Sequence, residues 1–394
     1  MILKEDIYYA RILAYHYQQY KAKGYKLSKL IAFYLPQFHE IPENNEWWGE
    51  GFTEWTNVKQ AQLWFNEHRQ PRIPYNRYYY DLTDPKAQEW QSDLALKYGL
   101  GGFCYYHYWF NGKLLLEKPM ENMLHNPKIK IPFCISWANE PWTRSWDGGK
   151  KKILINQSYG SEEDWKKHFD YLLPFFKDDR YIRVDNKPVF LIYRYPAIKN
   201  GDEMLEFFQK LAKESGLDGL HIVSTIHGRS LEYVDGPFID AFAQFEPMYT
   251  LIHRFSFWFR LWRFFKRNIL GQIMISLFGW LVPCLRNVDY DLVNEKIGEG
   301  LHYESDKPIY NGTFVGWDNT PRRGIDALIF QGEDVGKFGK YLGRALDIAL
   351  ENKSPFVFIN AWNEWAEGAY LEPDIDNCYG YLGAVKEQLK IRGL

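Results

Sequence analysis

Short apolar runs rich in β-branched and aromatic residues alternate along this chain with longer segments whose apolar residues recur at helical spacing. Eight of the apolar runs read as β-strands. They are LIAFYL (30–35), GGFCYYHY (101–108), IPFCISW (131–137), PVFLIYR (188–194), LHIVSTI (220–226), IDAFAQF (239–245), PIYNGTF (308–314) and PFVFINAW (355–362).

Helix-forming segments separate several of these runs. Eight strands that alternate with helices favour a (β/α)8 TIM barrel over a doubly wound sheet. The chain has no strong linker, low-complexity tract or internal repeat, so we expect one barrel domain with elaborated loops over 28–385. The expected helices lie at roughly 85–98, 114–125, 162–176, 201–215 and 333–352, with a helical insertion near 250–290, an N-terminal helical extension at 1–27 and a C-terminal tail at 386–394.

Composition narrows the classes of partner. The chain has 394 residues and a formal net charge of -2, so no global field favours nucleic acid, and we expect no nucleic-acid partner. Aromatic residues make up 18% of the chain, and many lie in polar loops, a pattern that suits carbohydrate stacking. The cysteines show no CxxC pair, and the N-terminus does not read as a secretory signal, so we expect a cytoplasmic protein with free thiols.

The loops after the predicted strands carry the unusual polar and aromatic residues, where barrel enzymes gather their active residues. These loops are 34–55, 105–113, 136–148 and 363–368. No histidine has the spacing of a metal ligand, so we expect neither a metal nor a cofactor. The substrate-binding candidates in these loops are His39, Trp48, Glu54, Trp55, Tyr106, His107, Trp137, Asn139, Glu140, Trp142 and Asn363.

Glu364 and Glu367 stand three residues apart among tryptophans, in FINAWNEWAEGAYLEPD from Phe358. They could be helix N-terminal carboxylates that cap backbone amides or stabilise the helix dipole. In the predicted barrel, however, both carboxylates can face one cavity and divide labour, one ionised and one protonated, as glycosidic bond chemistry requires. We therefore predict that they are the catalytic pair. The sequence leaves retention or inversion open.

Two further segments carry cations. WDNTPRR, from Trp317 through Arg322 to Arg323, is either a clamp for an anionic sugar or phosphate, or a surface turn. In the insertion 251–286, arginines, phenylalanines and tryptophans precede an apolar half. We predict peripheral attachment of this insertion to the inner face of the cytoplasmic membrane, and a helical hairpin packed on the barrel is the alternative.

Several ordered motifs resemble those of WbsX-like proteins, which are related to glycoside hydrolase family 99. They are AFYLPQFHEIPENNEWWGEGFTEW, QPRIPY, GFCYYHYWFNGK, WANEPW, WDNTPRRG and AWNEWAEGAYLEPD, and they span approximately 28–385. The resemblance implies a (β/α)8 barrel and retaining cleavage of α-mannosidic linkages without a metal. By the same resemblance, Glu364 would assist the sugar 2-hydroxyl, Glu367 would act as acid and then base, and Tyr34 and Glu140 would contact substrate.

WbsX-like proteins are associated with bacterial O-antigen or capsule assembly and have often been labelled glycosyltransferases. The leading hypothesis is therefore a glycan-active enzyme of surface-polysaccharide metabolism that acts on an oligosaccharide or a lipid-linked glycan by a retaining mechanism. A nucleotide-sugar glycosyltransferase is one alternative, since DxD-like triplets occur at 289–291 and 374–376. A non-catalytic glycan-binding barrel is the other.

Overall fold

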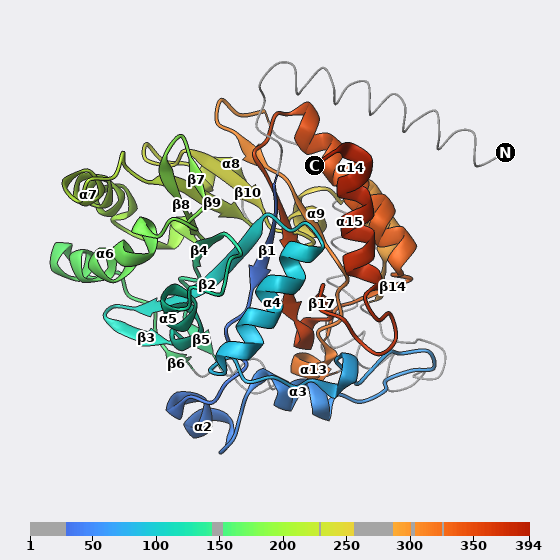
Figure 1. The fold of residues 1–394 in the computed structure, drawn as a ribbon. Helices are drawn as coiled ribbons and strands as arrows, with labels where there is room; N and C mark the ends of the chain where they lie inside the picture. The colour runs from blue at the N-terminus through green and yellow to red at the C-terminus, as the bar shows by residue number, and fades with distance from the viewer. Residues whose placement is uncertain (1–28, 144–152, 228–229, 256–286, 301–303, 325–326) are drawn as a thin grey trace, which may run out of the picture.

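The computed structural model describes residues 29–143, 153–227, 230–255, 287–300, 304–324 and 327–394. A parallel sheet forms the centre of this described part, and helices surround it (Figure 1). The sheet order is β12-β10-β9-β8-β4-β2-β1-β15-β13. Its main strands are β1 (Lys29–Tyr34), β2 (Gly102–Phe110), β4 (Phe133–Trp137), β8 (Lys187–Ile192), β9 (His221–Ile226), β10 (Ala241–Gln244), β12 (Ile309–Tyr310), β13 (Gly312–Phe314) and β15 (Phe356–Asn360).

The sheet closes into a barrel through Asn311. The two strands at the ends of the sheet order, β12 and β13, are successive in sequence and separated only by this residue. Asn311 donates its side-chain amide to the carbonyl oxygen of Ala345 in the covering helix, at 2.8 Å. The predicted seventh strand is thus split in two, and the predicted (β/α)8 barrel is confirmed.

The helices cover the outside of the barrel. The segment expected to be helical at about 114–125 begins instead with a short strand, β3, that pairs with β2, so the helix starts only at Lys118. The helices are α2 (Pro42–Trp48), α3 (Glu54–Gln60), α4 (Pro85–Lys97), α5 (Lys118–His125), α6 (Glu162–Lys177), α7 (Gly201–Glu214), α8 (Leu231–Val234), α9 (Met248–His253), α12 (Tyr290–Ile297), α13 (Thr320–Arg323), α14 (Val335–Glu351) and α15 (Gly380–Arg392), with 3-10 turns η1 (Tyr75–Arg77), η3 (Tyr195–Ala197) and η5 (Trp365–Glu367). Short strands outside the barrel path are β3 (Lys113–Leu115), β5 (Trp142–Thr143), β6 (Ile153–Ile155), β7 (Arg183–Val184), β11 (Asn287–Asp289), β14 (Ile329–Gln331), β16 (Asn363–Glu364) and β17 (Ala369–Tyr370).

Side chains of the barrel strands alternate between the interior and the helix layer, as strand geometry requires. Phe33 of β1 points inward, and its ring centroid lies 5.5 Å from that of Tyr106, 5.3 Å from Phe245 and 5.6 Å from Phe358. The next residue, Tyr34, points outward and donates to Gln91 of α4 at 2.6 Å. The barrel interior is therefore an aromatic core, and only the carboxyl ends of the strands are open to polar chemistry.

The structure describes only some of the segments that were predicted outside the barrel itself. The expected N-terminal extension 1–27 and residues 256–286 of the insertion lie outside the described residues. The expected tail 386–394 begins inside α15, which packs on α14 through a bidentate ion pair of Arg392 with Asp347, at 2.6 and 2.7 Å. Within the described ranges, no helix is long and apolar enough to cross a membrane.

Candidate active site

One arginine joins three carboxylates at the carboxyl ends of the barrel strands. The guanidinium of Arg322 in α13 lies 3.2 Å from Glu54, 3.1 Å from Glu364 and 2.8 Å from Glu367. Glu54 begins α3 after β1, and the glutamate pair follows β15, so three connections converge on one cation. We call these four residues the Arg322 cluster. Sequence reasoning named all four of its members.

Burial sets the electrostatics of the cluster. The side chains of Arg322 and Glu364 are each 8% exposed and that of Glu54 is 1% exposed, whereas Glu367 reaches 21%. Burial raises the pKa of Glu364 to about 8; Arg322 opposes this shift, and the charges of Glu367 and Glu54 add to it. Burial works to lower the pKa of Arg322, but its three carboxylates outweigh burial and raise it. Glu364 therefore holds a proton more readily than an ordinary glutamate.

All three guanidinium nitrogens of Arg322 contact carboxylate oxygens. Nε contacts Glu54, Nη1 contacts Glu367, and Nη2 contacts Glu364. A guanidinium that binds anions through its planar fork has no second fork to offer. These contacts position the glutamates, and a role of Arg322 as a clamp for an anionic sugar or phosphate stays a prediction.

The backbone around the two glutamates is held from both sides. The side-chain amide of Asn363 accepts from the backbone NH of Leu35 at 2.8 Å and donates to the Leu35 carbonyl at 3.0 Å, which ties β16 to the end of β1. Gly368 ends η5 with φ +64, and a Cβ there would lie only 3.0 Å from the backbone nitrogen of Asp318. That nitrogen donates to the carbonyl of Glu367 at 2.6 Å. Asn363, expected to bind substrate, thus has both ends of its amide engaged in fixing Glu364.

Asp318 organises the segment that delivers Arg322. Its carboxylate accepts from His68 at 2.9 Å, from Gln70 at 2.7 Å and from the hydroxyl of Thr320 at 2.7 Å. Burial alone would raise the pKa of Asp318, but the bond from His68, the charge of Arg72 and the bond from Gln70 lower it to about 2. The ionised Asp318 therefore holds α13 and the 61–72 segment together beneath the cluster.

Tyrosine hydroxyls surround the cluster. Burial, followed by the charge of Glu364, raises the pKa of Tyr106 and of Tyr108, and Tyr108 also accepts a bond from Gln37 at 2.9 Å. Burial, followed by Glu140 and then Glu367, raises the pKa of Tyr193. These hydroxyls stay protonated and can donate to a sugar oxygen. Sequence reasoning missed Tyr108 and Tyr193, although the period-two alternation from Tyr106 would have placed Tyr108 on the same face.

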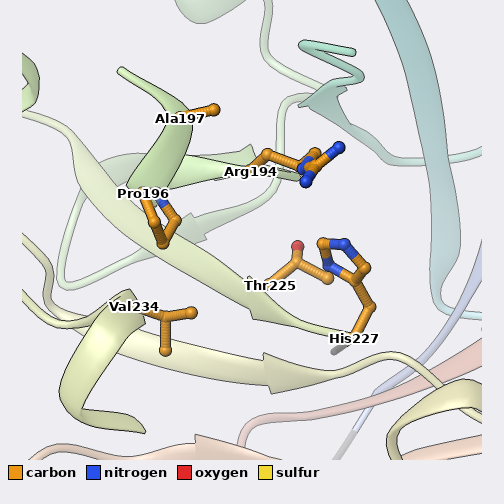
Figure 2. A pocket seen from close by; sticks show the side chains of 6 residues that line it. All are labelled: Arg194, Pro196, Ala197, Thr225, His227 and Val234. Atoms are coloured by element: carbon orange, nitrogen blue, oxygen red, sulfur yellow. The ribbon is translucent and has the colours of Figure 1, made fainter. Parts of the chain in front are cut away.

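A small, mostly apolar hollow lies at the ends of β8 and β9, next to Tyr193. Its volume is about 230 Å³ including open solvent, and Arg194 and His227 point into it over an apolar floor (Figure 2). Arg194 forms an ion pair with the predicted Glu140 at 2.8 Å. The ring of Tyr193 stacks on that of His227, with 4.5 Å between the two ring centroids.

Three expected substrate contacts lie on the outward face of their strands. The hydroxyl of Tyr34 donates to the side chain of Gln91 in α4. Nε2 of His107 lies 2.9 Å from Nε2 of His168 in α6. The indole of Trp137 donates to the carbonyl of Trp109 at 3.2 Å. Burial lowers the pKa of His107 to about 3, as expected for a neutral packing residue. The structure places these three residues between barrel and helices, away from the cluster.

The remaining candidates support the loops. Asn139 is fully buried and bonds the backbone of Arg194, and Trp55 donates to the carbonyl of Tyr80 at 2.8 Å while packing on Trp365. Trp142 packs edge-on against Tyr108. The other three are His39, which is buried with a pKa lowered by burial, Trp48, whose ring packs near Phe52, and Trp317, which is buried in a second apolar cluster. Among the described residues, no group of histidine, cysteine and carboxylate side chains is arranged to hold a metal ion.

Comparison with known proteins places the chain in a family. The sequence profile of the family described as Glycosyltransferase WbsX matches residues 30–385. The uncharacterized protein WxcX of Xanthomonas campestris pv. campestris (strain B100) is 35% identical over 365 residues, which cover 91% of this chain and 49% of the relative. A second strain of the same organism has a WxcX protein with the same identity and coverage. The chain therefore spans about half the length of these relatives.

Solved structures share the barrel. The family 99 endo-alpha-mannosidase from Bacteroides thetaiotaomicron superposes with a TM-score of 0.54 at 16% identity, covering 93% of this chain and 98% of that chain. A protein described as glycoside hydrolase-like gives a TM-score of 0.56 at 13% identity, covering 92% and 94%. At such identities the likeness is one of fold. Because the family profile covers most of its length, the chain belongs to the family Glycosyltransferase WbsX.

Proposed function

We propose that this chain is a glycan-active enzyme that cleaves or transfers a glycosidic linkage with retention, using Glu364 and Glu367 as the reacting carboxylates. One observation carries the proposal: Arg322 holds both glutamates, with Glu54, at the carboxyl ends of the barrel strands. A pair of carboxyl groups in unequal environments is what acid and base roles on a sugar require. The more exposed Glu367 and the more buried Glu364 form such a pair.

The roles are those that the resemblance to family 99 implies, and the exposure of the two side chains supports them. Glu367 protonates the leaving oxygen, because it is the member of the pair that solvent and substrate reach most easily. Glu364 takes the proton of the sugar 2-hydroxyl, and its raised pKa makes it a stronger base than an ordinary glutamate. As the proton leaves the 2-hydroxyl, that oxygen attacks the anomeric carbon while the aglycone oxygen departs with the proton of Glu367. Water or a sugar hydroxyl then attacks the anomeric carbon of the anhydro intermediate and gives its proton to Glu367, while the bond to the 2-oxygen breaks and Glu364 returns its proton to that oxygen.

The charge of the site favours this reaction over transfer from a nucleotide sugar. Three carboxylates and one guanidinium give the Arg322 cluster a net charge of -2 when all are ionised, a setting that repels a diphosphate. The DxD-like triplets also have structural uses. Asp289 caps α12 by accepting from the backbone of Leu292 at 2.8 Å, and Asp374 accepts from the hydroxyl of Tyr370 at 2.7 Å.

The biological setting is part of the proposal. The resemblance of the sequence motifs to those of WbsX-like proteins supports a substrate from a bacterial surface polysaccharide, either a free oligosaccharide or a lipid-linked glycan in the cytoplasm. Attachment to the membrane through 251–286 remains a sequence-based prediction, since 256–286 lie outside the described residues. An α-mannosidic linkage is the first to test, because a family 99 endo-alpha-mannosidase shares the fold.

The test separates hydrolysis, transfer and binding. Purified protein is incubated with α-mannose oligosaccharides, with other oligosaccharides and with nucleotide sugars, and NMR follows the anomeric protons of the products. We expect a glycosidic product whose first-formed anomer keeps the configuration of the substrate. Inversion would exclude the retaining mechanism, turnover of nucleotide sugars alone would favour the transferase alternative, and binding without product would favour the non-catalytic barrel.

A further inference from the structure

A pair of large apolar side chains lies exposed beside the Arg322 cluster, in the segment that follows α3. Leu63 is 66% exposed and Trp64 is 45% exposed, although most tryptophans of the described chain are buried or partly buried in its cores. Glu54 of the cluster begins α3, and that helix of seven residues is only about 10 Å long. The exposed pair is thus at the rim of the proposed active site.

Hydrogen bonds tie Trp64 to the catalytic pair. The backbone NH of Trp64 donates to Nδ1 of His68 at 3.2 Å, and Nε2 of the same ring lies 2.9 Å from the carboxylate of Asp318. The backbone nitrogen of Asp318 donates in turn to the carbonyl of Glu367 at 2.6 Å. Asp318 therefore fixes the segment that carries Trp64 through its carboxylate, and the backbone of Glu367 through its own NH.

The indole ring also rests on the segment that carries Arg322. Gly324 caps α13 with φ +52, two residues after Arg322, and a Cβ at Gly324 would lie 3.4 and 3.7 Å from two carbons of the Trp64 ring. The left-handed backbone and the close approach both suit glycine. The ring edge packs on this backbone, which holds the indole in place while nearly half of the side chain stays open to solvent.

We propose that Trp64 is the stacking platform of a second sugar subsite, which holds a pyranose ring of the glycan next to the sugar that carries the reacting bond. The inference rests on the proposed function. A flat apolar ring beside an active site binds the C–H face of a sugar, while hydroxyls at the sugar edge remain hydrated. The occupant is an uncharged sugar ring, since the carboxylate excess of the neighbouring cluster disfavours an acidic one.

The test measures binding without turnover. Glu367→Gln serves as the parent, and calorimetry compares it with Glu367→Gln/Trp64→Ala on α-mannose mono-, di-, tri- and tetrasaccharides and on glucose and galactose oligosaccharides of the same lengths. We expect Trp64→Ala to weaken binding of the longer saccharides about tenfold and to leave the monosaccharide unchanged. Trp64→Phe should restore most of the affinity. The melting temperature should stay within a few degrees, because the ring is partly exposed.

Tyr233→Ala is the matched control, since Tyr233 is an aromatic residue 60% exposed on α8, which Figure 1 draws far from α13. The control should bind every saccharide as the parent does. Equal affinities of parent and Trp64→Ala for all lengths, an equal loss at every length, or no binding of any saccharide would overturn the subsite. So would Trp64-dependent flotation with anionic phosphatidylglycerol vesicles in the absence of length-dependent saccharide binding. Length-dependent binding through Trp64 in a protein whose wild type turns over no glycan would instead uphold the subsite and reject the proposed catalysis.

Discussion

Asp318 and Glu364 are both buried at the same end of the barrel, with 1% and 6% of the whole residue exposed. The pKa values of their carboxyl groups nevertheless move in opposite directions. The pKa of Asp318 falls to about 2, and that of Glu364 rises to about 8. Asp318 accepts bonds from three neighbouring side chains and from a backbone NH. Glu364 shares the single cation Arg322 with two other carboxylates.

The difference shows that burial alone does not decide what a carboxyl group does. Donors that belong to one carboxylate stabilise its charge and make it a fixed structural anion. Glu364 shares its cation with two other carboxylates, and Arg322 does not offset the effect of burial on its pKa. The carboxylate with its own donors holds the scaffold, and the buried Glu364 without them is the one proposed for chemistry.

The largest expected effect comes from replacing the two carboxyl groups that are proposed to react. Glu364→Gln and Glu367→Gln should each lower kcat on a verified substrate by about 10²–10⁴-fold, because the amide keeps the shape but cannot transfer the proton. Circular dichroism and melting temperature should match the wild type. Glu351→Gln, at the exposed end of α14, is the control and should keep full activity. Near-normal turnover by either catalytic variant would remove that residue from the mechanism.

Asp318→Asn tests the structural role of the ionised Asp318. The new amide group faces donors that need an acceptor, so the free energy of unfolding should fall by about 2–4 kcal/mol, measured by urea denaturation. Asp179→Asn, an exposed aspartate, should change it little. An Asp318→Asn protein as stable as the wild type would contradict the assignment of Asp318 as the anchor of α13.

Arg322→Lys tests whether the glutamates need the planar guanidinium or only its positive charge. Lysine keeps the charge but cannot contact three carboxylates through a planar fork, so kcat/KM should fall by about tenfold as the glutamates lose their alignment. The exposed neighbour Arg323 supplies the control, and Arg323→Lys should be silent. Wild-type activity in Arg322→Lys would mean that the positive charge suffices and the geometry of the fork does not matter.

The smallest effect concerns pH. Glu364 must be ionised to act as a base, so its titration should give kcat/KM a limb that rises with pH around 8, as long as Glu367 keeps the proton that it donates. Because Arg322 lowers the pKa of Glu364, Arg322→Lys should move this limb to higher pH. Activity that falls as pH rises through the same range would reverse the role of Glu364 and make it the acid. Asp318 should produce no limb above about pH 3, because its pKa is about 2.

Much of the candidate site was predictable from the sequence motifs and from their positions after the predicted strands. The loops after the first and last strands named Glu54, Glu364 and Glu367, and WDNTPRR named Arg322. Orientation was not predictable where aromatic and polar residues follow one another at a strand end, as in YYHY at 105–108, because either face of the strand could then be the polar one. Tyr34 and His107 therefore face the helices, whereas Tyr108 and Tyr193 face the cluster.

The sequence by itself determined the barrel, because eight apolar runs separated by amphipathic segments leave few ways to bury their surfaces. It also determined that glutamates and aromatic residues would meet at the carboxyl ends of the strands. Only the tertiary structure decided which charges pair. Glu54 and Arg322 are 268 residues apart, and no local pattern records that one guanidinium will join them to both glutamates. Long-range packing sets the burial and the number of donors at each carboxyl group, and those two quantities separate the structural Asp318 from the proposed catalytic Glu364.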